Sequence, residues 1–373
     1  MIYFDNAATT KPSFTALEKA SVFNTEEFYN PSALYHGGIV NKSEINAAKQ
    51  KLLSFLNASS HELIFTSCGS ESDNQAILKN HSRGAVVTTL GEHSAVYNCF
   101  KELERLGRKV YFAPLNKDGS VDIDGLFDIV NSDKSIDFVS VVHVNNETGA
   151  INDVNKIAEE IKRINPKIIF HSDGVQAFGK IPYKIGNGVD LYSVSAHKIG
   201  GLKGIGALIR RKTVPIDALI LGGGQENGLR SGTENVFGIK VFEYAATERF
   251  SELTKHYENA VSIKEEILNT LDKSVYTVLS GDNASPYVIS ISAKKLKGEV
   301  VMHALETEKI VVGNGSACSS KHKFSRILSA CGYNSKVLDG VIRISSSAYN
   351  TVVQASVLAQ KLNEIAHRLK KVK

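Results

Sequence analysis

Five short apolar runs rich in β-branched residues recur between residues 63 and 194, and each ends in polar residues before a helical pattern begins. The runs are 63–65, 85–87, 138–142, 168–170 and 191–194. Between them, segments such as 98–106 and 155–164 carry apolar residues at three- and four-residue spacing, which is typical of amphipathic helices. Alternating strands and helices form a mostly parallel sheet that is covered on both faces. The sequence therefore predicts an α/β protein.

A polar cluster follows each of these runs. The clusters include Gly69 and Ser70, His93, Asn146, Asp173 with Gln176, and Ser195 with Lys198. In sheets of this kind, ligands bind beyond the carboxyl ends of the strands. We therefore expect loops that are far apart in the sequence to converge on one pocket.

The length of 373 residues allows one large core and a second, smaller domain. The formal charge of +5 arises from 44 basic and 39 acidic residues dispersed along the chain, which we interpret as a solvated surface and not as a nucleic-acid tail. No apolar stretch approaches the ~18 residues needed to cross a membrane, and the N-terminus lacks the pattern of a targeting segment. We expect a cytoplasmic protein that binds neither a membrane nor nucleic acid directly.

A domain boundary is expected near residue 250. Segment 244–271 reads as one long helix, after which strand-like pieces such as 275–279 alternate with helical ones. We expect a large domain over 15–250 that carries the ligand pocket. The small domain would consist of 1–14 and 251–373 and would carry the segment around Cys318.

The four cysteines are Cys68, Cys99, Cys318 and Cys331. They show neither paired Cys-x-x-Cys spacing nor the density of a secreted scaffold, so we expect reduced thiols and no metal site. We interpret Cys99 and Cys331 as inert core residues. Cys318 differs because it lies in a small-residue segment with basic residues at 321–323. An exposed thiol beside cations is suited to act as a nucleophile.

Lys198 ends the segment Ser-Ala-His-Lys, and Asp173 follows an apolar run upstream of it. A lysine amine can form a Schiff base with the aldehyde of pyridoxal phosphate, and a carboxylate can keep the ring nitrogen of this cofactor protonated. The short segment alone is a weak signal, and its combination with Asp173, Gln176 and His93 is what indicates the cofactor. Position alone also allows Asp173 to cap a helix and His93 to be a structural residue.

Three further features are suited to binding anions. Ser70 stands at the start of a helical pattern, where backbone N–H groups favour a phosphate. The glycines at 222–224 and the segment 230–233 form a loop that lets backbone and hydroxyl groups approach an anion, although three glycines alone would be an ordinary turn. Arg343 is a charge within an apolar run. Such an arginine is usually paired with a carboxylate, which here could belong to the substrate.

Taken together, these motifs resemble those of the cysteine desulfurases in the class V aminotransferase group. The segments that carry the resemblance are 5–10, 66–74, 92–93, 143–147, 195–199, 230–233, 315–318 and 342–345, so it covers nearly the whole chain. The resemblance implies a fold type I pyridoxal-phosphate enzyme. In that fold, a large domain has a mostly parallel seven-stranded sheet between helices, and a smaller domain is α+β.

The resemblance also implies a role for each candidate residue. Around the cofactor ring it places Lys198 on the aldehyde, Asp173 on the ring nitrogen, His93 stacked on the ring, and Gln176 with Asn146 near the ring oxygen. On the phosphate it places Gly69, Ser70, Ser195 and His197, with Thr233 reaching it from the neighbouring subunit of a homodimer. Arg343, helped by Asn146, would bind the carboxylate of L-cysteine.

By the same resemblance, Cys318 would attack the sulfur of the bound substrate, giving a protein persulfide and releasing L-alanine. Its loop is similar to the branch that passes sulfur to iron–sulfur scaffolds or tRNA-thiolating enzymes. Two alternatives stay open. A selenocysteine or cystine lyase of the same fold would release its product without a persulfide, and a non-catalytic member would only scaffold assembly. A dinucleotide-binding enzyme is disfavoured because no Gly-x-Gly-x-x-Gly stands at a strand-to-helix turn.

The sequence departs from the family pattern at three positions. Cys68 stands where glycine is general, Ser70 where threonine is common, and Leu202 where proline is usual. Ser70 keeps the hydroxyl group, so phosphate binding is expected to survive, and Leu202 should change only local rigidity. Cys68 is either a tolerated small residue or a second thiol near the cofactor that is prone to oxidation.

Overall fold

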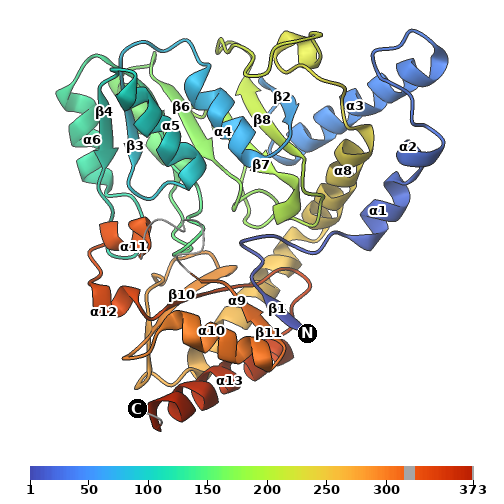
Figure 1. Ribbon diagram of the computed structural model, residues 1–373. Helices are drawn as coiled ribbons and strands as arrows, with labels where there is room; N and C mark the ends of the chain where they lie inside the picture. Colours follow the sequence, from blue (N-terminus) through green and yellow to red (C-terminus); the bar gives the residue numbers. More distant parts are fainter. Residues whose placement is uncertain (315–323, 372–373) are drawn as a thin grey trace.

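The computed structural model describes residues 1–314 and 324–371 (Figure 1). Its largest sheet has seven strands in the order β2-β8-β7-β6-β5-β3-β4. The strands are β2 (His61–Thr66), β3 (Ala85–Thr89), β4 (Val110–Ala113), β5 (Ile136–Ser140), β6 (Ile169–Asp173), β7 (Leu191–Ser195) and β8 (Gly206–Arg211). Strand β8 is antiparallel to β2 and β7, and the other neighbouring pairs are parallel. The predicted seven-stranded, mostly parallel sheet is confirmed.

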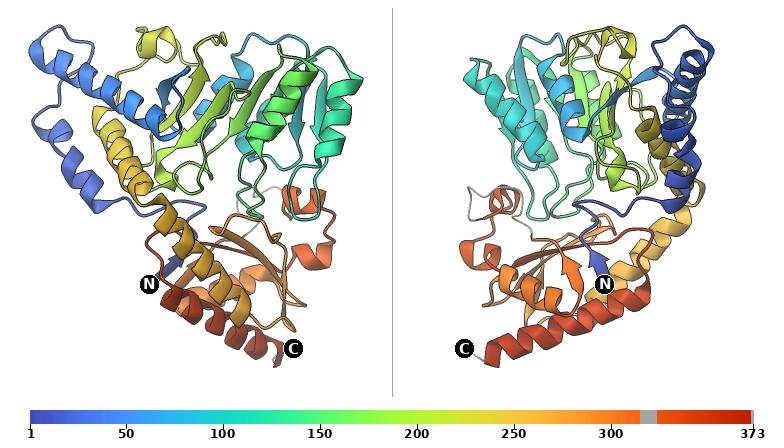
Figure 2. Two further views of the ribbon diagram at one scale, coloured as in Figure 1. Left: turned by 180° about the vertical axis from the view of Figure 1, so that it is seen from behind. Right: turned by 45° about the vertical axis from the view of Figure 1, so that its right-hand side comes forward.

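Helices cover both faces of this sheet (Figure 2). The helices on one face are α4 (Gly69–Leu78) and α5 (Ser94–Arg105), and those on the other are α3 (His36–Phe55), α6 (Ile123–Ser132), α7 (Val154–Ile164) and α8 (Val236–Ser251). Ile64 and Val86 belong to the first core, whereas their neighbours Leu63 and Val87 belong to the second. Successive side chains of a strand point to opposite faces, so each strand supplies both cores.

A third core, separate from the two on the faces of the large sheet, lies beside that sheet (Figure 1). Its strands are β12 (Val341–Ser345), β10 (Val288–Ala293) and β9 (Tyr276–Val278) in an antiparallel sheet, and β1 (Ile2–Phe4) in parallel with β11 (Ile310–Val312). Its longer helices are α9 (Leu253–Thr270), α10 (Gly298–Thr307) and α13 (Val352–Lys371). Phe4 and Ile365 are buried in this same core. Because this core is separate from the cores of the large sheet, we propose a large domain over 15–250 and a small domain formed by 1–14 and 251–373.

The prediction of one continuous helix over 244–271 is wrong. Helix α8 ends at Ser251 and α9 begins at Leu253, because Glu252 between them has φ −124° and ψ 27°, outside the helical range. Neither glycine nor proline marks this break, so periodicity alone did not reveal it. The remaining α-helices of the described residues are short: α1 (Phe14–Ala20), α2 (Val22–Thr25), α11 (Arg326–Ala330) and α12 (Ser335–Leu338). Within 1–314 and 324–371, no helix has the length and apolar character needed to span a bilayer.

Candidate active site

The carboxyl ends of the large sheet's strands open into one cavity of about 300 Å³. Ten residues predicted from the sequence line it: Gly69, Ser70, His93, Asn146, Asp173, Gln176, Ser195, His197, Lys198 and Arg343. Nine of them end or follow strands of the large sheet, and Arg343 comes from β12 of the small one. The structure therefore brings together side chains that are up to 274 positions apart (343 − 69).

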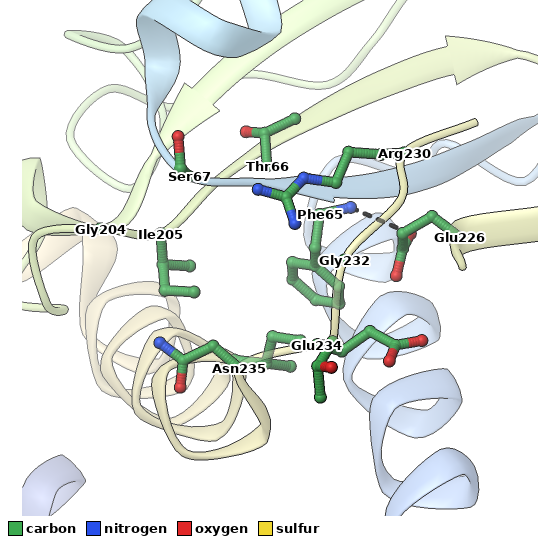
Figure 3. Close-up of a pocket in the computed structure, with 12 residues that line it drawn as sticks. Phe65, Thr66, Ser67, Gly204, Ile205, Glu226, Arg230, Gly232, Glu234 and Asn235 are labelled. Carbon is green, nitrogen blue, oxygen red and sulfur yellow. Dashed lines mark hydrogen bonds between the residues drawn. The ribbon is translucent and has the colours of Figure 1, made fainter. Parts of the chain in front are cut away.

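Two predicted residues are not placed in this cavity. Thr233 lines a separate pocket of about 150 Å³. Arg230 and Glu226 line the same pocket (Figure 3). In that pocket Oε2 of Glu226 accepts a hydrogen bond of 3.1 Å from the backbone N–H of Phe65. Cys318 lies outside the described residues.

Asp173 ends β6 with its side chain buried at the cavity wall. Its Oδ1 accepts a hydrogen bond of 2.9 Å from the backbone N–H of Val175, so it stabilises a turn and does not cap a helix. Burial raises the pKa of Asp173, and the nearby charge of His93 opposes that shift. A buried carboxylate of this kind is suited to pair with a cationic ring nitrogen.

The start of α4 forms a cradle for an anion. No side chain caps this ten-residue helix, whose first residue, Gly69, faces the cavity. A Cβ at Gly69 would lie 2.7 Å from Cγ2 of Val175 and 3.5 Å from Cβ of Ser195, so the backbone approaches β7 closely. The buried Oγ of Ser195 has no hydrogen-bond partner in the part of the chain that is described. Backbone N–H groups at a helix start and an unused hydroxyl fit a phosphate.

His197 lies beside this cradle in the short helix η1 (Ala196–Lys198). Burial, reinforced by the charge of Lys198, lowers the pKa of His197 to about 4, so its imidazole is neutral at pH 7. Its Nδ1 lies 3.1 Å from Oγ1 of Thr9. A neutral imidazole keeps one N–H group that can donate to an anion.

Nζ of Lys198 donates hydrogen bonds to the carbonyl oxygens of Ala7 (2.7 Å) and Ala8 (2.8 Å). Sequence reasoning gave no role to these two alanines, although they belong to the segment 5–10 that carried part of the resemblance. The sequence does not show which backbone carbonyl groups will accept hydrogen bonds. The only signal for the approach of Lys198 to this backbone is the small size of the two alanines.

His93 combines a structural contact with a place in the cavity. Its Nδ1 accepts a hydrogen bond of 3.2 Å from the backbone N–H of Ala95 and so caps α5. The proton of the neutral imidazole is therefore on Nε2. Burial lowers the pKa of His93, while the carboxylate of Asp173 opposes the shift. His93 can therefore cap α5 through Nδ1 and still present Nε2 for a role in the cavity.

A second buried carboxylate, Asp73, lines the cavity and was missed in the sequence. Burial, followed by the negative charge of Asp173, raises the pKa of Asp73 well above its ordinary value. Cys68 lines the cavity as well, as a free, half-buried thiol. In the described ranges, no group of three or more His, Cys, Asp or Glu side chains is placed to hold a metal ion.

Arg343 is paired with a carboxylate of the protein itself. Its Nη2 lies 2.9 Å from Oδ1 of Asp5, and its Nη1 donates a hydrogen bond of 3.0 Å to the backbone oxygen of Asn146. The side-chain oxygen of Asn146 is buried and unpaired within the described ranges. The expected arginine–carboxylate pair therefore exists, but Asp5 supplies the carboxylate.

Residues 2–358 match the family described as Aminotransferase class-V. The chain belongs to this family. Relatives named Cysteine desulfurase IscS include one from Dictyoglomus turgidum, which is 35% identical and matches 100% of this chain and 96% of its own length. Another, from Methanosarcina thermophila, is 34% identical and matches 99% of this chain and 93% of its own length. A solved structure titled NIFS-LIKE PROTEIN has a TM-score of 0.90 at 32% identity and covers 99% of both chains. The resemblance predicted from the sequence and the fold class that it implied are confirmed.

Proposed function

We propose that this protein is a pyridoxal-phosphate-dependent cysteine desulfurase that converts L-cysteine to L-alanine and takes up the sulfur on Cys318 as a persulfide. The observation that carries this proposal is the meeting of Lys198, Asp173 and Arg343 in one cavity. They offer an amine for an aldehyde, a carboxylate for a ring nitrogen and a guanidinium for a substrate carboxylate. The names of the relatives support the same activity.

The cavity suits pyridoxal phosphate. When bound, this cofactor supplies an electron sink for the bonds of an amino acid. Lys198 would hold its aldehyde, and Asp173 would keep its ring nitrogen charged. Ser195 and His197 would bind the phosphate at the start of α4, where Gly69 permits the close approach. The remaining contacts would come from Ser70 at the phosphate and from Gln176 and Asn146 at the ring oxygen.

Side chains of this protein would position the substrate and move its protons and sulfur. Arg343 would bind the carboxylate of L-cysteine and so direct its thiol into the cavity. His93 would stack on the ring and move a proton at Nε2, because its Nδ1 is engaged by Ala95. The thiolate of Cys318 would attack the substrate sulfur: the S–S bond forms, the bond from sulfur to the β-carbon breaks, and protonation of that carbon yields L-alanine.

The residues on either side of 315–323 support this role for Cys318. Gly313 exchanges two backbone hydrogen bonds of 2.9 Å with Arg343. On the other side, Ser325 donates a hydrogen bond to the carboxylate of Glu147. Arg326 donates hydrogen bonds to the carbonyl oxygens of Leu90 and Glu92, just before His93. Its guanidinium carbon Cζ lies 3.8 Å from the centre of the Tyr97 ring. The approach from Gly313 is therefore held by Arg343, which lines the cavity, and the approach from Ser325 and Arg326 is held by residues adjacent to the lining residues Asn146 and His93.

Exposed apolar side chains support a homodimer. Leu34 is 93% exposed, Tyr35 and Ile39 are exposed within five positions of it in the chain, and Leu221 on a separate segment is 84% exposed. Large apolar groups gathered on a surface are usually covered by a partner. We infer that a second copy covers them and that its Thr233 reaches the phosphate, since Thr233 lies outside the cavity of its own chain.

We further propose a protein acceptor for the sulfur, either an iron–sulfur scaffold or a tRNA-thiolating enzyme. Transfer from a persulfide requires reduced thiols, so we infer that the protein acts in the cytoplasm.

Mass spectrometry after incubation with L-cysteine tests the proposal. We expect one extra sulfur atom on Cys318 and L-alanine in stoichiometric amount. Cys318→Ser should abolish alanine formation from L-cysteine but leave the absorbance of the bound cofactor intact. Undiminished turnover in this variant would favour a selenocysteine or cystine lyase, and a colourless protein that binds no pyridoxal phosphate would favour a scaffold.

Cys99→Ala is the matched control. Burial raises the pKa of the Cys99 thiol to about 12, so it carries no thiolate at neutral pH. Cys99→Ala should still form L-alanine from L-cysteine and should still carry the extra sulfur atom on Cys318.

A further inference from the structure

The pairing of Asp5 with Arg343 brings a carboxylate of the protein into the cavity where a substrate carboxylate would bind. Asp5 follows β1, and Arg343 is the middle residue of β12. Their side chains are 21% and 8% exposed, so the ion pair is largely shielded from water. Both residues line the cavity.

The guanidinium of Arg343 does not use all of its donors. Nη1 donates to Asn146 and Nη2 to Asp5, while Nε is buried without an acceptor in the described part of the chain. A carboxylate is bound most strongly when two N–H groups on one edge of the guanidinium donate in parallel. On the edge formed by Nε and Nη2, one donor is unused and Asp5 occupies the other.

Gly313 provides the space for this arrangement. A Cβ at Gly313 would lie 3.1 Å from both Nε and Nη2 of Arg343. Residue 313 therefore lies in front of the guanidinium edge that these two nitrogens form. The same Cβ would lie only 2.5 Å from Oδ1 of Asp5. The carboxylate of Asp5 therefore sits at the very edge that has a donor to spare, and a side chain at 313 would push it away.

We propose that Asp5 is a specificity-determining residue that competes with the substrate carboxylate for Arg343. The inference rests on the proposed function, in which Arg343 binds the carboxylate of L-cysteine. In the free enzyme, the charge of Asp5 offsets that of Arg343. An anion that cannot displace Asp5 therefore binds only weakly at this site. A substrate carboxylate displaces Asp5 from Nη2, takes Nε as well, and so makes two parallel hydrogen bonds where Asp5 makes one.

The opposite interpretation is that Asp5 only supports Arg343 and holds it in the orientation that the substrate needs. The two interpretations predict opposite changes in the affinity for carboxylate ligands when the charge of Asp5 is removed. If Asp5 competes, removal of its charge strengthens the binding of carboxylate ligands. If Asp5 supports Arg343, the same change weakens that binding.

Asp5→Asn separates them, because asparagine keeps the size of the side chain and removes its charge. The pyridoxal-phosphate-loaded protein is titrated with L-alanine, which has the substrate's carboxylate but no sulfur. We expect the dissociation constant for L-alanine to fall about fivefold, the effect of losing one ion-pair contact at this degree of exposure. The KM for L-cysteine should fall with it, more than kcat changes. L-alaninamide, which has no carboxylate, should bind both proteins equally.

Asp128→Asn serves as the control, since it makes the same charge change at an exposed site on α6. It should leave both dissociation constants unchanged. Asp5→Ser, whose side chain is too short to reach Arg343, is measured in parallel in case the asparagine variant does not fold. An unchanged or larger dissociation constant for L-alanine in the folded variant overturns competition. If instead the wild-type protein forms no alanine from L-cysteine, the proposed function fails, and this inference fails with it.

Discussion

Nζ of Lys180 donates a hydrogen bond of 2.7 Å to Oε1 of Gln176. The amide nitrogen of Gln176 in turn donates to the carbonyl oxygen of Ala7 at 2.9 Å, and this oxygen also accepts from Lys198. An amide has one donor end and one acceptor end, so Lys180 fixes which end of Gln176 points toward Ala7. The buried amine of Lys180 is thereby linked to the lysine that we expect to hold the cofactor.

Lys180→Met should flatten the dependence of folding stability on pH. Burial, followed by repulsion from Lys198 and Arg249, lowers the pKa of Lys180 well below its ordinary value of 10.5. Between that lowered pKa and 10.5, the unfolded chain binds more protons than the folded one, so this group makes stability rise with pH. Thermal unfolding at several pH values from 7 to about 10 measures the difference between the two proteins.

The control for that prediction is Lys156→Met, which removes an exposed ammonium from α7. Its unfolding temperatures should run parallel to those of the wild type. If the curve of Lys180→Met also runs parallel, Lys180 does not titrate as its burial predicts.

Glu92→Gln should flatten the stability profile over a lower pH range. Burial raises the pKa of Glu92 from 4.5 to about 8. Between these values the folded protein binds more protons than the unfolded chain, so stability falls as pH rises, by up to about 1.4 kcal/mol per pH unit. The variant can keep the hydrogen bonds that Oε1 accepts from Thr89 and Val142, at 2.8 and 2.9 Å.

Urea unfolding at pH 5, 6 and 7 would compare wild type with Glu92→Gln and with Glu265→Gln, a change at an exposed position on α9. Only in Glu92→Gln should the free energy of unfolding no longer fall as the pH rises. Equal declines in all three proteins would mean that Glu92 is ionised in the folded state throughout this range.

The sequence predicted the cavity well where strand ends supply side chains. Asp173 and Ser195 each end a strand of one parallel sheet, so their convergence follows from the strand–helix alternation alone. Asp5 and Ala7 could not be found in this way. They follow β1, which pairs with β11 about 300 positions later, and no local periodicity encodes that contact. Ala7 moreover acts through its carbonyl oxygen, which every residue type has.

Asp173→Asn should weaken the binding of pyridoxal phosphate without unfolding the protein. The amide oxygen can still accept the hydrogen bond from Val175, so the turn after β6 is kept. The charge that would pair with the ring nitrogen is lost, and breaking a buried pair costs about 3–5 kcal/mol, or a factor of at least a hundred in affinity. Equilibrium dialysis with the cofactor measures this loss, and thermal unfolding without cofactor should differ little.

Ser195→Ala should weaken cofactor binding while leaving the fold as stable as before. The hydroxyl of Ser195 is buried and makes no hydrogen bond within 1–314 and 324–371, so its removal sacrifices no internal contact. A hydrogen bond to a charged phosphate is worth about 1.5–3 kcal/mol, so affinity for pyridoxal phosphate should fall by a factor of about 10 to 100. Affinity for pyridoxal, which lacks the phosphate, should not change.

Ser172 offers a matched control for Ser195, because its hydroxyl is also buried without a partner in the described chain, yet it does not line the cavity. Ser172→Ala should change neither affinity. Both serines are strand residues with unused hydroxyls, so a general effect of removing a buried hydroxyl would appear in both variants. Loss of phosphate-dependent affinity in Ser195→Ala alone would tie that hydroxyl to the anion. An equal loss in both variants, or an equal loss for pyridoxal, would contradict the phosphate site at the start of α4.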